Sequence, residues 1–263
     1  MVKLEIQEGI ATVTLNAPEK YNALSPEMID ELTASFDQIE TNPEVRACIV
    51  TGTGAGFCAG ADLSAGQATQ ESPHTRAEES GQAMRETLNP LIKKILNLPI
   101  PTIAAVNGVA AGGGYGLALS FDLVIASERA SFKLVFTPQL GVIPDLGASW
   151  HAPHLLGRAQ AIARSYFGDS MNAEEAVARG LIWKVVPHDA LAGEANRVAA
   201  ELVRGPTQAY VAVRHAFDHA SASTLEQQLD YEAQVQPALI ATDDFLEGVA
   251  AFAMKRKPVF KGR

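Results

Sequence analysis

Hydrophobic and polar residues alternate near the start of the chain. Between residues 10 and 15, Ala11, Val13 and Leu15 are separated by residues of the opposite face, and this period of two predicts a β-strand. The turn-forming sequence Asn-Ala-Pro at residues 16–18 ends it. A Ser-Pro-Glu sequence at 25–27 then has the N-cap pattern of a helix, and apolar residues follow at helical spacing, namely Met28, Leu32, Phe36 and Ile39.

Short apolar runs continue the pattern. Residues 46–51 and 102–106 are largely apolar and end in glycine-containing turns, which is typical of buried strands in a parallel sheet. A helical pattern over 84–96 separates them. A helix-compatible segment at 115–120 precedes another buried strand at 122–126. This βαβα order predicts parallel strands with right-handed crossovers.

Helix signals dominate from about residue 144, with a single short strand expected at 181–186. Asn172 with Glu175 and Thr224 with Gln227 have capping-box spacing, and Gly180 fits a helix stop. Residues 64–82 are polar and small, so we expect a mobile surface loop near Gly60–Asp62. The last third of the chain should therefore be mostly helical.

Composition limits the class of protein. The chain has 263 residues, 47% of them hydrophobic, which suits one large domain with an appendage. Thirty acidic against 21 basic side chains give a net charge of −9, which disfavours binding to nucleic acid or anionic membranes. Any polyanionic ligand would need local positive charge.

The two cysteines provide neither a disulfide framework nor a multi-cysteine zinc site. No run approaches the roughly 20 apolar residues of a membrane span, and the first residues lack the apolar stretch of a signal peptide. We therefore expect a cytoplasmic protein.

Three segments carry candidate chemistry. The first, residues 57–63, is a loop of small residues after a buried strand. Its N–H groups are free of side chains that would block a ligand, although a tight turn that needs glycine explains the same residues.

The second segment, residues 106–116, contains Gly112, Gly113 and Gly114 between a strand and a helix. Free N–H groups and the positive end of the helix dipole suit an anion or a developing oxyanion, and purely structural glycines are an equal alternative. No Gly-Lys-Ser/Thr follows, so the segment is not a Walker loop. It is also a poor dinucleotide fingerprint.

The third segment, residues 140–150, contains Asp145 after a proline and among apolar residues. This aspartate could simply cap the helix expected there. In an apolar pocket, desolvation would instead raise its pKa and make it a usable base.

The order and spacing of these segments resemble the crotonase (enoyl-CoA hydratase/isomerase) superfamily over nearly the whole chain. The resemblance is carried by FCAGADL, AVNGVAAGGGYGLAL, FKLVFTPQLGVIPDLGASW, GLIWKVVP and FAMKRKPVFKGR. Within the superfamily, residues 132–136, 141–145 with Trp150, and 180–183 most resemble the 1,2-epoxyphenylacetyl-CoA isomerases of phenylacetate degradation.

The resemblance implies an α/β fold, a spiral of ββα units over residues 1–195, followed by a helical C-terminal trimerisation segment over 196–263. It implies a homotrimer, commonly a hexamer made of two trimers. The substrate would be an acyl-CoA thioester, with coenzyme A part of the substrate and no separate cofactor. The thioester oxygen would be held by the N–H groups of Ala61 and Gly113, two donors suited to an enolate.

The resemblance also implies a set of residues around the substrate. They are Lys20, Asn22, Ala23, Ala59, Asp62, Leu63, Gly112, Tyr115, Phe136, Trp150, Phe252 and Lys255. Lys255 and Phe252 would reach the CoA in a neighbouring subunit, although the basic residues 255–257 also fit a solvated C-terminus. His151 and His154 lie one helical turn apart without a third ligand, so no metal site is expected.

One departure from the family pattern bears on the reaction. Hydratases of the family use two glutamates, and the corresponding positions here are Gly116 and Thr137. Asp145 is the carboxylate that remains, at a position used by isomerases. The resemblance thus favours an isomerase with Asp145 as acid and base, over a hydratase or a non-catalytic acyl-CoA-binding or RNA-associated homologue.

Overall fold

The computed structural model describes residues 1–62 and 73–263. Its larger sheet has six strands in the order β1-β2-β3-β5-β7-β10. β1 is antiparallel to β2, and the other neighbours are parallel. The strands are β1 (Val2–Gln7), β2 (Ile10–Leu15), β3 (Ala47–Gly52), β5 (Thr102–Val106), β7 (Leu123–Ser127) and β10 (Lys184–Val186). The expected parallel sheet is confirmed.

A smaller sheet of four short strands lies beside it, in the order β4-β6-β8-β9. Its strands are β4 (Gly56–Cys58), β6 (Val109–Ala111), β8 (Ser131–Lys133) and β9 (Met171–Asn172). β3, β5 and β7 of the larger sheet are each followed by a strand of the smaller one and then by a helix. These repeated ββα units form the spiral, and they deliver residues 59–62 and 112–113 from adjacent strands.

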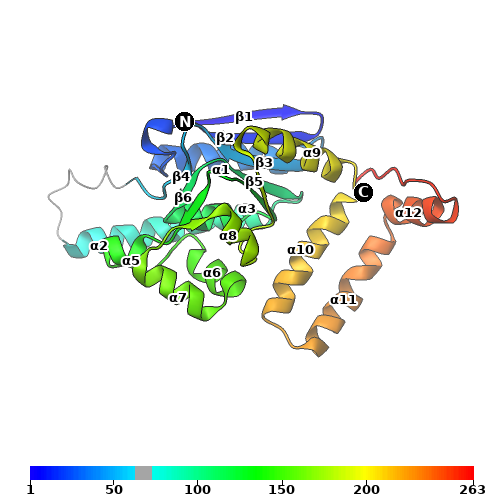
Figure 1. The fold of residues 1–263 in the computed structure, drawn as a ribbon. Coiled ribbons are helices and arrows are strands. Elements are labelled where there is room, and N and C mark those ends of the chain that lie inside the picture. The colour runs from blue at the N-terminus through cyan, green and yellow to red at the C-terminus, as the bar shows by residue number, and fades with distance from the viewer. Residues whose placement is uncertain (63–72) are drawn as a thin grey trace.

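Helices surround the two sheets and extend beyond them (Figure 1). They are α1 (Pro26–Thr41), α2 (Pro73–Ala83), α3 (Asn89–Leu96), α4 (Gly113–Leu119), α5 (Phe136–Leu140), α6 (Ala148–Leu156), α7 (Arg158–Phe167), α8 (Ala173–Ala178), α9 (Leu191–Val203), α10 (Thr207–Ser221), α11 (Leu225–Ile240) and α12 (Asp243–Ala253). No helix in the described part of the chain is long and apolar enough to cross a membrane.

The central strands of the larger sheet, β3, β5 and β7, are buried on both faces, which explains their continuous apolar sequences. Cys48 and Val50 of β3 belong to the main core, whereas Ala47 and Ile49 pack on the opposite face. That second face is covered by α9 through residues such as Val198. Successive side chains of a strand point to opposite faces, so both sets must be apolar.

The helix caps predicted from sequence are confirmed. The hydroxyl of Ser25 accepts the Met28 N–H, and Thr224 with Gln227 forms a complete capping box. Asn172 accepts the Glu175 N–H at the start of α8. These side chains satisfy N–H groups that have no partner within the helix.

Some predicted boundaries are wrong. Residues 73–82, expected in a loop, form α2, which continues through a π-helical turn (Met84–Leu88) into α3. α2 is polar and mostly exposed, so no apolar stripe marks it. The remaining residues of that expected loop, 64–72, lie outside the described residues. The strand expected at 181–186 contains only 184–186, and the two-residue strand β9 was missed.

The C-terminal helices α10 and α11 form a hairpin that leaves the core, and α12 lies at the open end of the hairpin, on the side where α10 begins (Figure 1). Residue 195 lies within α9, whose buried face packs on the larger sheet. We therefore propose that the C-terminal segment begins after α9, near Pro206, about ten residues later than the sequence suggested.

Arg214 of α10 ties this hairpin to the core. Its guanidinium pairs with both oxygens of Asp122 and donates to the carbonyls of Leu96, Leu98 and Ile100. Asp122 also accepts the N–H and hydroxyl of Thr102 at the start of β5. Only 8% of the Arg214 side chain is exposed, so its bonds to the three carbonyls are partly shielded from water, whereas its bonds to Asp122 lie nearer the surface.

Replacing Arg214 with alanine should destabilise the fold. The Asp122 carboxylate and three carbonyls would lose their donor, and breaking a buried pair from one side typically costs about 3–5 kcal/mol. We expect a loss of about 3 kcal/mol in the free energy of unfolding, measured in urea, because Asp122 is partly exposed. Arg197→Ala, which removes an exposed ion-paired arginine from α9, should have almost no effect. Equal losses in both variants would contradict this role.

Candidate active site

The loop after β4 presents the N–H of Ala61. Ala61 forms a parallel bridge with Leu24, in which Leu24 N donates to Gly60 O (2.7 Å) and Asp62 N donates to Leu24 O (3.2 Å). This pattern uses the groups on either side of Ala61, so its own N–H points away from Leu24. Within residues 1–62 and 73–263 the Ala61 N–H has no acceptor. Ala61 is also exposed.

A second N–H is presented by Gly113, the first residue of α4. Gly112 before it has φ +53° and donates to Lys133 O (3.1 Å). The first N–H groups of a helix have no acceptor within the helix, and in the described parts of the chain the Gly113 N–H has none either. The conformation of Gly112 favours glycine because of its positive φ.

The two loops touch each other at glycines. Gly60 has φ +90°, and a Cβ added to it would lie only 2.7 Å from the nitrogen of Gly113. A Cβ added to Gly114 would overlap the carbonyl of Cys58. No side chain fits between the loops, so the backbone next to Ala61 lies directly against the backbone of Gly113.

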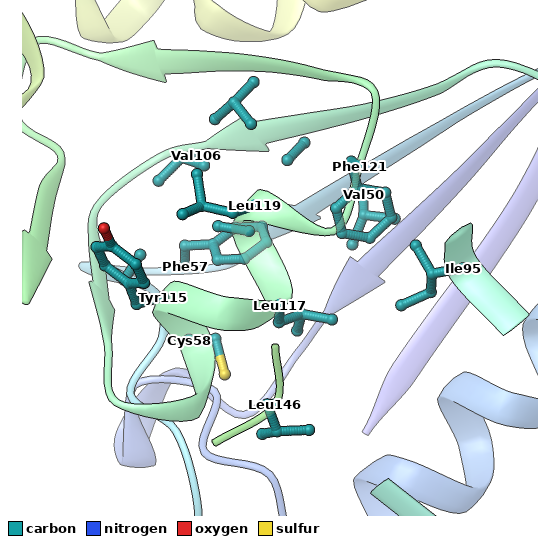
Figure 2. Packing of buried hydrophobic residues seen from close by; sticks show 14 of the residues in the cluster. Val50, Phe57, Cys58, Ile95, Val106, Tyr115, Leu117, Leu119, Phe121 and Leu146 are labelled. Carbon is teal, nitrogen blue, oxygen red and sulfur yellow. The ribbon is translucent and has the colours of Figure 1, made fainter. Parts of the chain in front are cut away.

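Asp145 lies on a turn that packs against Gly113 through its neighbour Leu146. A Cβ added to Gly113 would overlap the Leu146 side chain and lie 3.5 Å from the Cα of Gly60. Figure 2 shows Leu146 beside the helix that carries Tyr115 and Leu117. Leu146 and Gly147 have φ +48° and +80°, and Ala148 N donates to Asp145 O (2.8 Å).

Asp145 therefore precedes a reversing turn, and the helix that we expected to open at Asp145 begins at Ala148, as α6. Its side chain is half-buried. Burial raises the pKa of Asp145 above the usual range of an aspartate, because desolvation disfavours the carboxylate, and a bond from its own backbone N–H offsets this in part. A base with a raised pKa accepts a proton more readily near neutral pH.

Three of the residues expected around the substrate, Lys20, Asn22 and Ala23, lie in one loop between β2 and α1. Lys20 Nζ lies 2.7 Å from a carboxylate oxygen of Asp62. The hydrogen bond to Asp62 raises the pKa of Lys20, so the ammonium stays charged. Ala23 N donates to Lys20 O, and Ala59 N donates to Tyr21 O. The loop is thereby joined to the segment that carries Ala61.

Asn22 of the same loop has no exposed surface. Its side chain bonds to Ala17, Thr53 and Gly56 of the surrounding backbone. In this conformation it positions the loop, and it has no surface with which to contact a ligand.

The three aromatic residues expected around the substrate differ in exposure. Tyr115 and Phe136 are buried, and Tyr115 packs edge-on against Phe132. Burial raises the pKa of Tyr115, whose hydroxyl has no partner in the described structure. Trp150 is 46% exposed and stacks on His154 at 4.4 Å between ring centroids. Of the three, Trp150 is the ring that a ligand can reach.

The remaining expected residues lie elsewhere. Leu63 falls outside the described residues. Phe252 is 88% exposed on α12, and Lys255 follows that helix. Figure 1 shows α12 on the opposite side of the molecule from β4 and β6. A single chain does not bring Phe252 and Lys255 to the Ala61 and Gly113 loops.

Other reactive side chains near the site are held in unreactive states. Burial raises the pKa of the Cys58 thiol to about 12, so the thiol stays protonated at neutral pH. Burial lowers the pKa of His151 to about 4, and its ring lies near Ser120, whereas His154 Nδ1 bonds to Trp150 O. No cluster of three or more His, Cys, Asp or Glu side chains in residues 1–62 and 73–263 is arranged to hold a metal.

Sequence reasoning missed Asn107, which connects β5 to β6. Its side chain bonds to Gly52, Gly54 and Gly56. A signal was present, because a polar amide stands between an apolar strand and Gly108, where a side chain would overlap Ala55 O. The side-chain amide of Asn107 takes the place of backbone hydrogen-bond partners where residues 107–108 pass close to the β3–β4 connection.

Comparison with known proteins agrees with this geometry. The enoyl-CoA hydratase/isomerase family matches residues 5–263. A 1,2-epoxyphenylacetyl-CoA isomerase of Escherichia coli is 39% identical over 258 residues, covering 98% of this chain and 97% of that protein. A probable enoyl-CoA hydratase of Rhodobacter capsulatus is 42% identical, covering 100% and 98%. The crystal structure of an enoyl-CoA hydratase from Bacillus anthracis has a TM-score of 0.91 at 32% identity, covering 100% and 99%.

This chain therefore belongs to the crotonase, or enoyl-CoA hydratase/isomerase, superfamily and has its α/β fold. It is an enzyme of that superfamily that acts on acyl-CoA.

The raised pKa of Asp145 predicts a stability effect with a definite sign. The folded state holds the proton more tightly than the unfolded state, so the stability present at acid pH is lost as pH rises through the folded-state pKa. Asp145→Asn should therefore melt at a higher temperature than the parent at neutral pH, and the two should converge in acid. Thermal unfolding across pH measures this, with Asp169→Asn as an exposed control. A lower melting temperature at neutral pH would contradict the assigned burial.

Proposed function

We propose that this enzyme is an acyl-CoA isomerase in which Ala61 and Gly113 hold the thioester oxygen and Asp145 moves the proton. For a 3-enoyl-CoA, Asp145 takes a proton from C2 and the electron pair moves to the thioester oxygen as an enolate. The same carboxyl then returns the proton to C4, which gives the 2-enoyl-CoA. Two fixed N–H donors stabilise charge that appears only along this path.

The observation that carries this proposal is the contact between Gly116 and the turn of Asp145. A Cβ on Gly116 would overlap the carbonyl oxygen of Leu146 and lie 3.1 Å from Ala148 N. No carboxylate fits at this first hydratase position. At the second, the Thr137 hydroxyl of α5 donates to Val142 O (2.9 Å), just after the end of the same helix. Asp145 is the acid left for proton transfer.

A ring epoxide is a second substrate class for the same site. The E. coli relative is named for a 1,2-epoxyphenylacetyl-CoA substrate. In that reaction Asp145 would relay a proton during ring opening while the same donors hold the thioester. The exposed face of Trp150 suits an aromatic acyl group.

Hydration is the alternative function. The R. capsulatus relative, named as a probable enoyl-CoA hydratase, is nearly as similar as the isomerase. Hydration needs a group that activates water and a group that delivers a proton to the substrate. A single half-buried carboxylate, Asp145, would have to do both. A non-catalytic acyl-CoA-binding homologue is the third reading.

The isomerase proposal is tested with two substrates. The enzyme should convert a 3-enoyl-CoA to the conjugated 2-enoyl-CoA, followed by its ultraviolet absorbance, and should add water to crotonyl-CoA far more slowly. Asp145→Asn should lower isomerisation by about 100-fold or more, since general acid–base catalysis contributes about 10²–10⁴. The rate should fall with acid, with a midpoint above the usual aspartate range, because the ionised carboxylate is the base.

Three results would contradict this proposal. Faster hydration than isomerisation would favour a hydratase. Turnover that is unchanged in Asp145→Asn would exclude the proposed base. Acyl-CoA binding without turnover of either substrate would favour the non-catalytic reading.

We also propose a homotrimer, and a hexamer of two trimers, built through the C-terminal helices. Large apolar side chains on this segment are exposed in the single chain, among them Val213, Phe217, Leu225, Leu246 and Phe252. An exposed apolar surface of this kind is typical of an interface. A neighbouring subunit would then place its own Phe252 and Lys255 near the CoA.

Light scattering coupled to size-exclusion chromatography measures the assembly. The intact chain should elute with three or six times the 27.9 kDa of one subunit. Phe217→Asp should dissociate it, because a charge would be buried in the interface. A monomeric parent protein would contradict the proposal.

The free thiols of Cys48 and Cys58 are both buried. Unoxidised cysteines of this kind fit a reducing compartment. We propose a cytoplasmic enzyme.

A further inference from the structure

Two buried asparagine side chains meet at one carbonyl oxygen. The Nδ2 of Asn22 lies 2.8 Å from Gly56 O, and the Nδ2 of Asn107 lies 3.1 Å from the same atom. Asn22 has no exposed surface and Asn107 is 8% exposed. A carbonyl oxygen has two lone pairs, so both bonds can form together.

Each amide also makes further bonds to the backbone. Asn22 accepts Ala17 N–H (2.8 Å) and donates to Thr53 O (3.0 Å). Asn107 accepts Gly52 N–H (3.1 Å) and donates to Gly54 O (3.0 Å). Both side chains thus act on the connection between β3 and β4. Asparagine suits these positions because one short side chain supplies an acceptor and two donors.

These bonds join the segments that carry the two N–H donors. Gly56 begins β4, which leads to Ala61, whereas Asn107 begins the connection to β6, which leads to Gly113. Asn22 lies between Tyr21, whose carbonyl accepts Ala59 N–H, and Leu24, which bridges Ala61. The segment that leads to Ala61 and the segment that leads to Gly113 therefore meet at one atom, Gly56 O, which accepts a hydrogen bond from each of the two asparagines.

We propose that Asn22 and Asn107 are positioning residues that set the separation of the Ala61 and Gly113 N–H groups. This rests on the proposed function, in which those two N–H groups hold the thioester oxygen. Catalysis by such donors depends on their position before the charge develops. Loss of either amide would leave buried carbonyls unpaired and allow the β3–β4 connection to move.

The variants are chosen so that the backbone conformation is preserved. Asn22 has φ +56°, so Asn22→Gly removes the amide and leaves that conformation accessible. Asn107→Ala removes the other amide. Asn107→Ser is a milder variant that retains a small polar group if the alanine variant does not fold. Asp122→Asn is the matched control, because it weakens the buried Arg214 network away from the donor loops.

Carbonyl polarisation is the deciding measurement. Carbonyl-¹³C butanoyl-CoA, which is saturated and unreactive, is bound to the enzyme and its C=O stretch is followed by difference infrared spectroscopy. The parent enzyme should lower this frequency. Asn22→Gly and either Asn107 variant should lose at least about half of that shift and lower kcat by about 10–100-fold, less than the roughly 10²–10³ for loss of a whole donor.

Substrate affinity separates positioning from general damage. KM and the Kd of free CoA should change by less than about threefold, since uniform binding is retained. Asp122→Asn should lose thermal stability and keep both the infrared shift and kcat. A folded Asn22 or Asn107 variant with the full shift and full kcat would overturn the positioning role alone. A parent enzyme that does not shift the carbonyl stretch would overturn both this role and the proposed function.

Discussion

The close approach of two main chains is the constraint on which the site depends. Gly60 and Gly113 lie so near each other that a single methyl group on Gly60 would collide with the backbone nitrogen of Gly113. The chain meets this constraint with Gly60 in a conformation of positive φ and with short strands in a second sheet. Because side chains are excluded, the chemistry available there is that of the peptide N–H group, which needs no ionisation and is fixed before a substrate arrives.

Much of the fold was accessible from sequence where patterns are long. The parallel strands of the larger sheet and the caps at Ser25 and Thr224 follow from period, burial and turn residues. The three-residue strands of the smaller sheet were not, because three residues carry no measurable period. The turn at Leu146 could not be predicted either, because a leucine in the sequence gives no indication of a φ of +48°. The contact of Leu146 with Gly113 joins residues that lie far apart in the sequence, so it could not be seen in the local pattern.

The motifs predicted Ala61, Gly113 and Asp145 as parts of one site, which stays a prediction, but they gave no indication of how the surrounding region is supported. Asn107 has the appearance of a turn residue in sequence and is a buried connector in the fold. Relatives named as isomerase and as hydratase are almost equally similar to this chain. Overall identity therefore does not separate an isomerase from a hydratase, and the proposed isomerase rests on one contact, in which Leu146 O occupies the space beside Gly116.

β5 links two networks at its ends. Thr102 at its beginning is bonded to Asp122 and so to Arg214 of the C-terminal hairpin, whereas Asn107 follows its last residue. Five residues of extended chain span only about 17 Å, and this strand is buried along its whole length. The C-terminal hairpin and the connection that leads to Gly113 are thus bonded to opposite ends of one buried strand, which keeps the two hydrogen-bond networks at a fixed spacing.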